Sequence, residues 1–420
     1  MLNRVQSHLR KFFEVGEEKD VFSLILLNGT VLLYSFAFWL SRLTIPYLFL
    51  SIKASPIIFG YYEALYALIQ LLGLRISKEV SINCDTKLAL QLGNLGFLIS
   101  FLLLGFSKNL LLLFCSAIPL LLSHNLTISR NLAIILSKRE NEQRALTTIT
   151  LSNTLGTILG SLFSGFLLPS LGFLVVFLCS GLLVLLNMIL IGVLLPKKVY
   201  VRPYNDTTFT SKLPDLPHVI KQPDANFLLS CLASLSLTLF MFKTAGVMYL
   251  VTELLAPPEV VGVISAMGAL LGFIAKHFTA TNQFYRLTLC EATTVLIFGL
   301  LLFFPAKIPV YAGLMFFALI STGVSTSLSL LIAACRVEGK HTLFELAHSA
   351  VHLSCICAPA LASLLLSFGG FQYVCLVGGL LGLASLLKTL SFESTFEYSE
   401  SEHSFNFNGY FPTGVVFNFI

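Results

Sequence analysis

Long runs of apolar residues, separated by short polar turns, fill most of this chain. Each run has about twenty predominantly apolar residues, the length of an α-helix that crosses the hydrocarbon core of a bilayer. About twelve such runs are found, and we expect an all-α membrane protein. The predicted transmembrane helices cover residues 22–49, 57–74, 88–106, 109–128, 147–168, 173–195, 226–251, 260–281, 287–304, 309–333, 344–366 and 371–390.

The longest polar stretch between these runs divides them into two halves of six. It covers residues 196–225 and carries five basic residues, so we interpret it as a cytoplasmic central loop. The expected domains on either side are an N-terminal six-helix bundle at 22–195 and a C-terminal six-helix bundle at 226–390. Residues 1–21 are expected to form a cytoplasmic N-terminal segment, and residues 391–420 a loosely attached cytoplasmic tail.

A weak internal repeat relates the two halves. When the chain is slid against itself by about 202 positions, Tyr47-Leu48 falls on Tyr249-Leu250 and Gly60 falls on Gly262. A similar slide places residues 160–165 over residues 358–363. Two parallel repeats related by an axis along the membrane normal are typical of transporters.

The distribution of basic residues predicts the orientation of the helices. With the N-terminus inside, the even-numbered turns carry most of the Lys and Arg residues, as the positive-inside rule requires. Both termini are therefore expected in the cytoplasm. Which membrane holds the protein is not indicated by this pattern.

Overall composition excludes several classes of protein. The chain is 56% hydrophobic and 11% charged, far from the balance of a soluble enzyme. A net charge of +5 is too small to suggest a nucleic-acid partner. The nine cysteines show no metal-binding spacing, and no nucleotide-binding or nucleophile motif is found. We expect no metal, no cofactor, no catalytic residue and no enzymatic activity.

Several short motifs resemble the major facilitator superfamily, and more narrowly its organic-cation-transporter-like branch, solute carrier family 22 member 18. They include Ile45-Pro46-Tyr47-Leu48, Glu142-Gln143-Arg144-Ala145-Leu146 and Leu213-Pro214-Asp215-Leu216-Pro217. The resemblance implies a twelve-helix major facilitator fold that transports by alternating access. The chain departs from the family in the loop between the second and third helices, where Lys78 and Ile82 stand near an expected Gly and Asp.

Three ionisable residues inside the predicted spans are candidates for substrate binding, because charge in hydrocarbon is costly and marks functional sites. Arg42 and Glu63 lie at similar depths in consecutive antiparallel helices, so their charges can meet. Lys243 lies one position from the repeat equivalent of Arg42, and two such cations would favour an anionic or zwitterionic solute. The alternatives are a structural ion pair, and snorkelling of the basic side chains to the headgroups.

Glu345, His348 and His352 follow one stripe of the eleventh predicted helix. Histidine titrates near physiological pH, so His348 and His352, together with Glu63, are our candidates for proton coupling. The alternative is that these side chains have only structural roles, with Glu345 at the membrane interface.

Small residues on the fifth predicted helix form a packing motif: Gly156, Gly160, Ser161 and Gly165. Pro359 stands in the second-half copy. Small residues allow helix backbones to approach closely. The motif predicts either a contact that slides during gating or a tight static packing, and spacing does not separate these alternatives.

These observations predict a secondary transporter of a small organic solute that is monomeric in the lipid bilayer and coupled to protons. The alternative is a non-transporting membrane protein with a regulatory or binding role. Its support is the altered loop motif, together with Ala117 in place of a basic residue expected early in the fourth helix.

Overall fold

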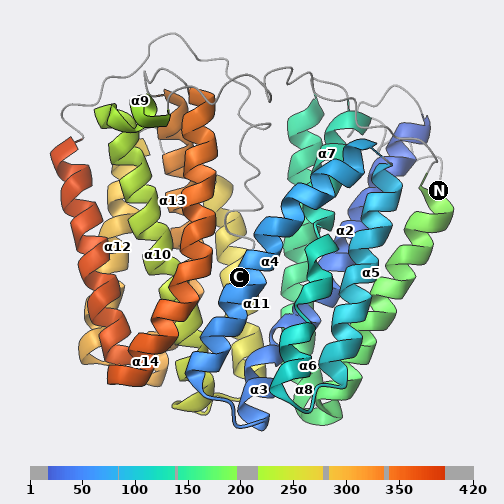
Figure 1. The fold of residues 1–420 in the computed structure, drawn as a ribbon, viewed down its shortest axis with the longest axis horizontal. Helices are drawn as coiled ribbons and strands as arrows, with labels where there is room; N and C mark the ends of the chain where they lie inside the picture. The colour runs from blue at the N-terminus through green and yellow to red at the C-terminus, as the bar shows by residue number, and fades with distance from the viewer. Residues whose placement is uncertain are drawn as a thin grey trace. The chain divides into compact units, whose positions relative to one another are not determined.

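The computed structural model describes residues 18–83, 85–137, 141–195, 216–277, 283–334 and 340–392, and all regular structure in these ranges is helical (Figure 1). The predicted N-terminal segment, most of the central loop and the tail lie outside these ranges. The elements are α2 (Glu18–Arg42), α3 (Thr44–Ser51), α4 (Pro56–Asn83), α5 (Thr86–Gly105), α6 (Leu110–Cys115), η1 (Ile118–Leu122), α7 (Asn125–Leu136), α8 (Glu142–Leu194), α9 (Leu216–Lys221), α10 (Pro223–Thr252), α11 (Pro258–His277), α12 (Gln283–Phe303), α13 (Lys307–Ala334) and α14 (Lys340–Phe392).

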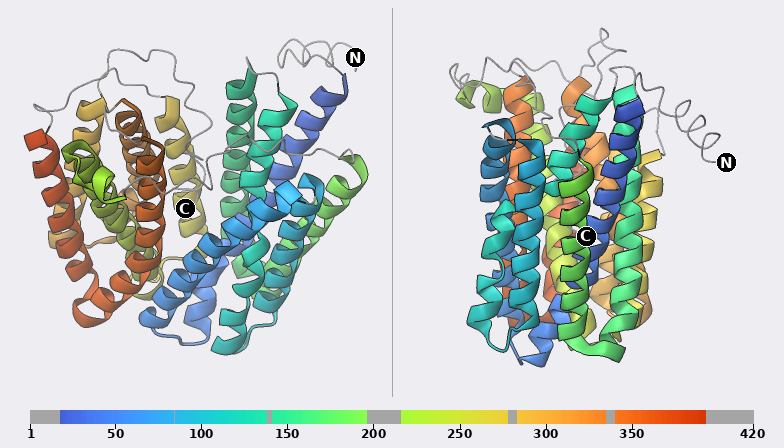
Figure 2. Two further views of the ribbon diagram at one scale, coloured as in Figure 1. Left: turned by 45° about the horizontal axis from the view of Figure 1, so that its top comes forward. Right: turned by 90° about the vertical axis from the view of Figure 1, so that its right-hand side faces the viewer.

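Two long helices, α8 and α14, each account for two predicted spans. A non-helical residue breaks each of them, Gly172 with φ 76° and Gly370 with φ 72°. Glycine adopts positive φ without the steric cost that a Cβ imposes, so the chain can reverse there. Figure 2 shows α8 and α14 as pairs of limbs that run in opposite directions. The all-α fold is therefore confirmed, and the two reversals are consistent with the predicted twelve spans.

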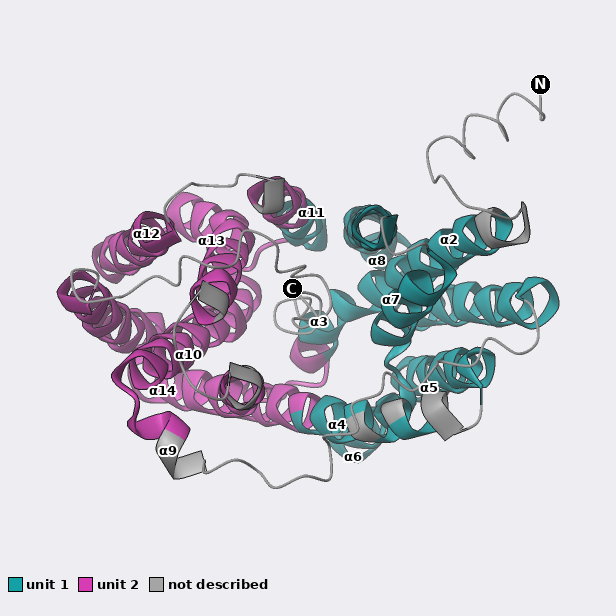
Figure 3. Ribbon diagram, turned by 90° about the horizontal axis from the view of Figure 1, so that it is seen from above, with its two compact units in different colours: residues 1–48, 68–209, 258–266 teal, residues 49–67, 210–257, 267–420 magenta. Residues whose placement is uncertain are grey.

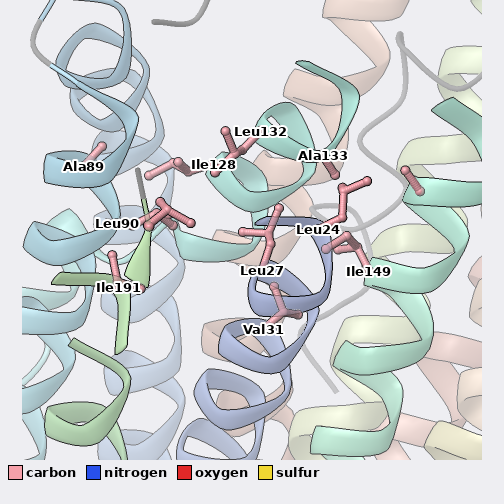
Figure 4. Packing of buried hydrophobic residues seen from close by; sticks show 12 residues of the cluster. Leu24, Leu27, Val31, Ala89, Leu90, Ile128, Leu132, Ala133, Ile149 and Ile191 are labelled. Atoms are coloured by element: carbon pink, nitrogen blue, oxygen red, sulfur yellow. The ribbon is translucent and has the colours of Figure 1, made fainter. Parts of the chain in front are cut away.

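The chain forms two compact units, coloured separately in Figure 3. Unit 1 contains residues 1–48, 68–209 and 258–266. Leu24, Leu27 and Val31 of α2 pack in its core, against the apolar faces of α5, α7 and α8 (Figure 4). Because lipid tails are as apolar as leucine, close van der Waals packing holds such helices together rather than exclusion from water.

Unit 2 contains residues 49–67, 210–257 and 267–420. In this unit α10 packs along α14 and also contacts α13. Aromatic rings reinforce this packing: Tyr249 stacks on Phe371 with centroids 4.4 Å apart, and Phe242 meets Phe298 edge to face at 5.2 Å. Since α4 and α11 contribute to both units, the boundaries of the two six-helix bundles stay a prediction.

The fourth predicted span differs from the continuous helix expected over residues 109–128. It consists of α6, the short 3-10 helix η1 that begins around Pro119, and α7, which continues to Leu136. Proline lacks the N–H that a helix interior needs, which explains the interruption. The extension of α7 brings Arg130 inside the span, whereas the sequence pattern had placed it in the following turn.

Candidate functional site

The three candidate substrate-binding residues lie on three helices. Arg42 is the last residue of α2 and belongs to unit 1. Glu63 on α4 and Lys243 on α10 both belong to unit 2, and all three side chains are half-buried. The predicted pairing of Arg42 with Glu63 joins different units, and it stays a prediction.

Within unit 2, α4 and α10 both lie beside the first limb of α14. A Cβ on Gly60 would lie 2.6 Å from the Pro359 carbonyl oxygen, so the two backbones touch there. Glu63 is one turn further along α4, about 5 Å along the helix axis. Lys243 interacts electrostatically with Cys355, one turn before Pro359. Two of the candidate substrate-binding residues, the acidic Glu63 and the basic Lys243, therefore lie near this stretch of α14.

The two candidate histidines are brought into direct contact. The Nε2 atoms of His348 and His352 are 2.9 Å apart, and the ring planes are nearly perpendicular. One ring donates and the other accepts, according to the tautomers present. His352 is buried and His348 half-buried, whereas Glu345 is exposed. The structure thus joins two of the three candidate proton-coupling residues by one hydrogen bond, and a role in proton coupling stays a prediction.

Gly156 and Gly160 pack against α2. A Cβ on Gly156 would lie 2.7 Å from the Leu32 carbonyl oxygen, and one on Gly160 would lie 2.6 Å from the Phe36 carbonyl oxygen. These distances are too short for any side chain, so α2 and α8 meet backbone to backbone in unit 1.

The other half of the small-residue motif faces a different helix. A Cβ on Gly165 would lie 2.8 Å from the Pro258 carbonyl oxygen of α11, and one on Gly262 would lie 2.6 Å from the Ser161 carbonyl oxygen. The contact of Gly60 with Pro359 in unit 2 corresponds to the contact of Gly262 with Ser161 in unit 1. Residues related by the sequence repeat thus make equivalent helix contacts in each unit. A gating role for these contacts stays a prediction.

Sequence reasoning missed an amide cluster in unit 1. Asn94 Oδ1 accepts hydrogen bonds from Asn125 Nδ2 at 2.8 Å and from Asn187 Nδ2 at 3.2 Å. The three side chains are buried and link α5, α7 and the second limb of α8. Amides carry no charge, so a search limited to ionisable residues could not find them.

Three buried charged residues were also missed: Arg130, Arg286 and Glu291. Arg130 on α7 is 7% exposed, and its Nη2 has no hydrogen-bond partner among the described residues. Glu291 on α12 is fully buried. Glu291 lies inside the predicted span 287–304. A search for ionisable residues within the predicted spans would therefore have found it.

Replacing Asn94 by leucine is expected to destabilise unit 1 by about 2–4 kcal/mol, because two buried amide donors lose their shared acceptor. Thermal unfolding of the purified protein in detergent measures the effect. Leu102→Ala provides the control, since Leu102 is exposed on the same helix. An unfolding midpoint as high in Asn94→Leu as in Leu102→Ala would contradict a stabilising role for the cluster.

In the described ranges, no group of three His, Cys, Asp or Glu side chains is arranged to hold a metal ion.

The structure holds ten helices that are long and apolar enough to cross a membrane, counting each of α8 and α14 once and considering described residues only.

Comparison with known proteins gives matches of three kinds. The sequence profile described as Major Facilitator Superfamily matches residues 27–342. Human Solute carrier family 67 member A1 is 32% identical over 133 residues, a match that covers 30% of this chain and 31% of that relative. The narrower likeness to the organic-cation-transporter-like branch is not supported by these matches.

Solved structures share the fold at low sequence identity. A bacterial homologue of the human lysosomal transporter Spinster has a TM-score of 0.68 at 12% identity, with coverage of 91% of this chain and 98% of the other. The nucleoside transporter NupG has a TM-score of 0.67 at 11% identity, with coverage of 89% and 100%.

Proposed function

We propose that this chain, which belongs to the Major Facilitator Superfamily, is a secondary transporter that moves a small organic solute across a membrane by alternating access and is coupled to protons. The family match and the apolar helices support a multi-pass membrane transporter. The observation that carries proton coupling is the hydrogen bond between His348 and His352, since two titratable rings share it beside the helices that bear Glu63 and Lys243.

The chemistry of the half-buried groups favours a particular class of solute. Arg42 and Lys243 supply positive charge inside predicted spans, where charge is costly and marks functional sites. An anionic or zwitterionic solute would be attracted to these two cations. Glu63 is proposed as the carboxylate that exchanges a proton during the cycle.

Uptake into proteoliposomes tests both parts of this proposal. Purified protein in lipid vesicles, screened against a mixture of small organic anions and zwitterions, should accumulate at least one of them faster when the outside is acidic. His352→Gln is expected to lose the acid acceleration but keep the uptake driven by the solute gradient, because glutamine can donate and accept hydrogen bonds but does not titrate. The measurement is the initial rate of uptake at several external pH values.

Glu345→Gln is the matched control, since Glu345 lies exposed on the same limb of α14. It should behave as wild type. Equal acid acceleration in His352→Gln and wild type would remove the histidine pair from proton coupling. Absence of uptake for every solute would contradict transport itself.

A non-transporting, regulatory or binding role is the second candidate function. The altered motif, which the structure places in the last two turns of α4 instead of in a loop, has Lys78 and Ile82 near the expected Gly and Asp and favours this role. A solute that raises the unfolding temperature of the purified protein but produces no flux in proteoliposomes would support this role.

A further inference from the structure

A carboxyl group lies fully buried among three helices of unit 2. Glu291 Oε1 on α12 accepts hydrogen bonds from Ser385 Oγ at 2.7 Å and from Thr389 Oγ1 at 3.1 Å, both on the second limb of α14. Cys231 Sγ of α10 lies 3.8 Å from Thr389 Oγ1. Glu291 Oε2 is buried and has no hydrogen-bond partner among the described residues. Counted from the start of α12, the residue is about 12 Å along the helix.

Two cations on the neighbouring turns of α12 and α14 donate to other partners. Lys388 donates to Ser230 Oγ, and Arg286 Nη2 donates to the Ala275 carbonyl oxygen at 2.8 Å. No described cation makes an ion pair with Glu291. The titratable or charged side chains on the described elements around it are as follows: Asp224, Cys231, Lys243 and Tyr249 on α10; Tyr285, Arg286 and Cys290 on α12; Tyr373, Cys375 and Lys388 on the second limb of α14; Lys221 on α9; and Lys307 and Tyr311 on α13.

The other half of the chain holds a neutral polar cluster at the same register. Asn94 is the ninth residue of α5, and Glu291 is the ninth residue of α12. Asn187 lies fifteen positions after the break at Gly172, and Ser385 lies fifteen positions after the break at Gly370. A side-chain amide is uncharged and has nearly the same size and shape as a protonated carboxylic acid. The repeat therefore places a polar, uncharged group at this position in unit 1.

The cost of burial indicates the charge state of Glu291. A carboxylate would leave Oε2 charged, buried and without a donor, which is far more costly than an unpaired neutral hydroxyl. Ser385 and Thr389 both donate to Oε1, the oxygen that remains a carbonyl if the proton sits on Oε2. Both observations fit a neutral acid with its proton on Oε2.

We propose that Glu291 is a proton-binding site within unit 2, which holds a proton on Oε2 while α10, α12 and the second limb of α14 are packed together. Entry of water between these helices would allow the proton to pass to a water molecule, and the carboxylate would then be hydrated. This site is separate from the histidine pair, and it does not require the chain to transport anything.

Infrared spectroscopy of the protein in lipid vesicles tests the proposal without a transport assay. At neutral pH the wild type should show the C=O stretching band of a protonated carboxylic acid, and Glu291→Gln should lose that intensity. Glu253→Gln is the control, because Glu253 is exposed at the end of α10 and lies outside the buried cluster; it should leave the band unchanged. An unchanged band in Glu291→Gln would overturn the proposal.

A second variant keeps the test decisive if Glu291→Gln does not fold. Ser385→Ala removes the closer hydrogen bond to Oε1 but leaves the carboxyl in place. The C=O band of the acid should then move to higher frequency, because a carbonyl that accepts fewer hydrogen bonds has a stiffer double bond. A band that stays at the wild-type frequency in Ser385→Ala would show that it does not belong to Glu291.

The pH dependence of stability provides an independent measurement. The unfolded chain releases this proton above about pH 4.3, whereas the folded protein keeps it. The stabilisation is therefore complete at lower pH and is lost as pH rises. Between about pH 5 and pH 7, the unfolding temperature of wild type should fall relative to Glu291→Gln by about 1–2 °C per pH unit.

Parallel curves for the two proteins would contradict proton binding, because a purely structural glutamate shifts stability equally at every pH. The same measurement in sodium and in choline salts separates a proton from a metal ion. A sodium-dependent rise in stability that Glu291→Gln abolishes would overturn the proposal in favour of a sodium site.

Discussion

Gly160→Leu is expected to leave little folded protein. A Cβ at this position would lie 2.6 Å from the Phe36 carbonyl oxygen and 2.7 Å from Trp39 Cβ, and neither neighbour is a flexible side-chain end. The larger side chain therefore has to push α2 and α8 apart, which removes a close backbone contact between these two helices. Overpacking of this kind costs about 3 kcal/mol or more.

The yield of monodisperse protein on size exclusion, with its thermal midpoint, measures this effect. Gly29→Leu is the matched control on α2, since no heavy atom lies within 4 Å of a Cβ built at Gly29. It should give a wild-type yield. Gly160→Ala should fall between the two variants. If Gly160→Leu and Gly29→Leu gave equal yields, the close contact of α2 with α8 would not support the fold.

Glu63→Gln is expected to abolish pH-dependent uptake while the protein still reaches the cell surface. Glutamine keeps the size and the hydrogen-bonding capacity of the half-buried side chain, but it cannot gain or lose a proton. A transporter that exchanges a proton at this carboxyl would then lose its response to external acid. Uptake at several pH values, normalised to surface-labelled protein, measures the change.

Two comparisons make the Glu63 result specific. Glu253→Gln removes an exposed carboxylate of the same unit and should leave the pH response intact. Lys243→Gln should weaken the uptake of anionic solutes at every pH, because it removes a cation rather than a titrating group. Acid-stimulated uptake that is unchanged in Glu63→Gln would remove this residue from the mechanism.

The prediction of the spans succeeded because the bilayer imposes a one-dimensional rule. Every segment that crosses hydrocarbon must be apolar for about twenty residues and must satisfy its own backbone hydrogen bonds, so the helices can be read from the sequence. Even the two reversals, at Gly172 and Gly370, fall in the gaps left between neighbouring predicted spans. The fourth span was less accurate, since α7 continued to Leu136 and included a buried Arg130.

The sequence by itself determined the all-α membrane class, the pattern of twelve spans and the family resemblance, since each depends on local composition or on short motifs. Only the tertiary structure decided that the small residues of α8 serve two different helices, that His348 and His352 share a hydrogen bond, and that Glu291 meets Ser385. The physical reason is the direction of each side chain around its helix axis. In several of these contacts the two helices are about 90 residues or more apart in the sequence. The direction of each side chain therefore depends on how the helices pack, which the hydropathy of a single helix does not encode.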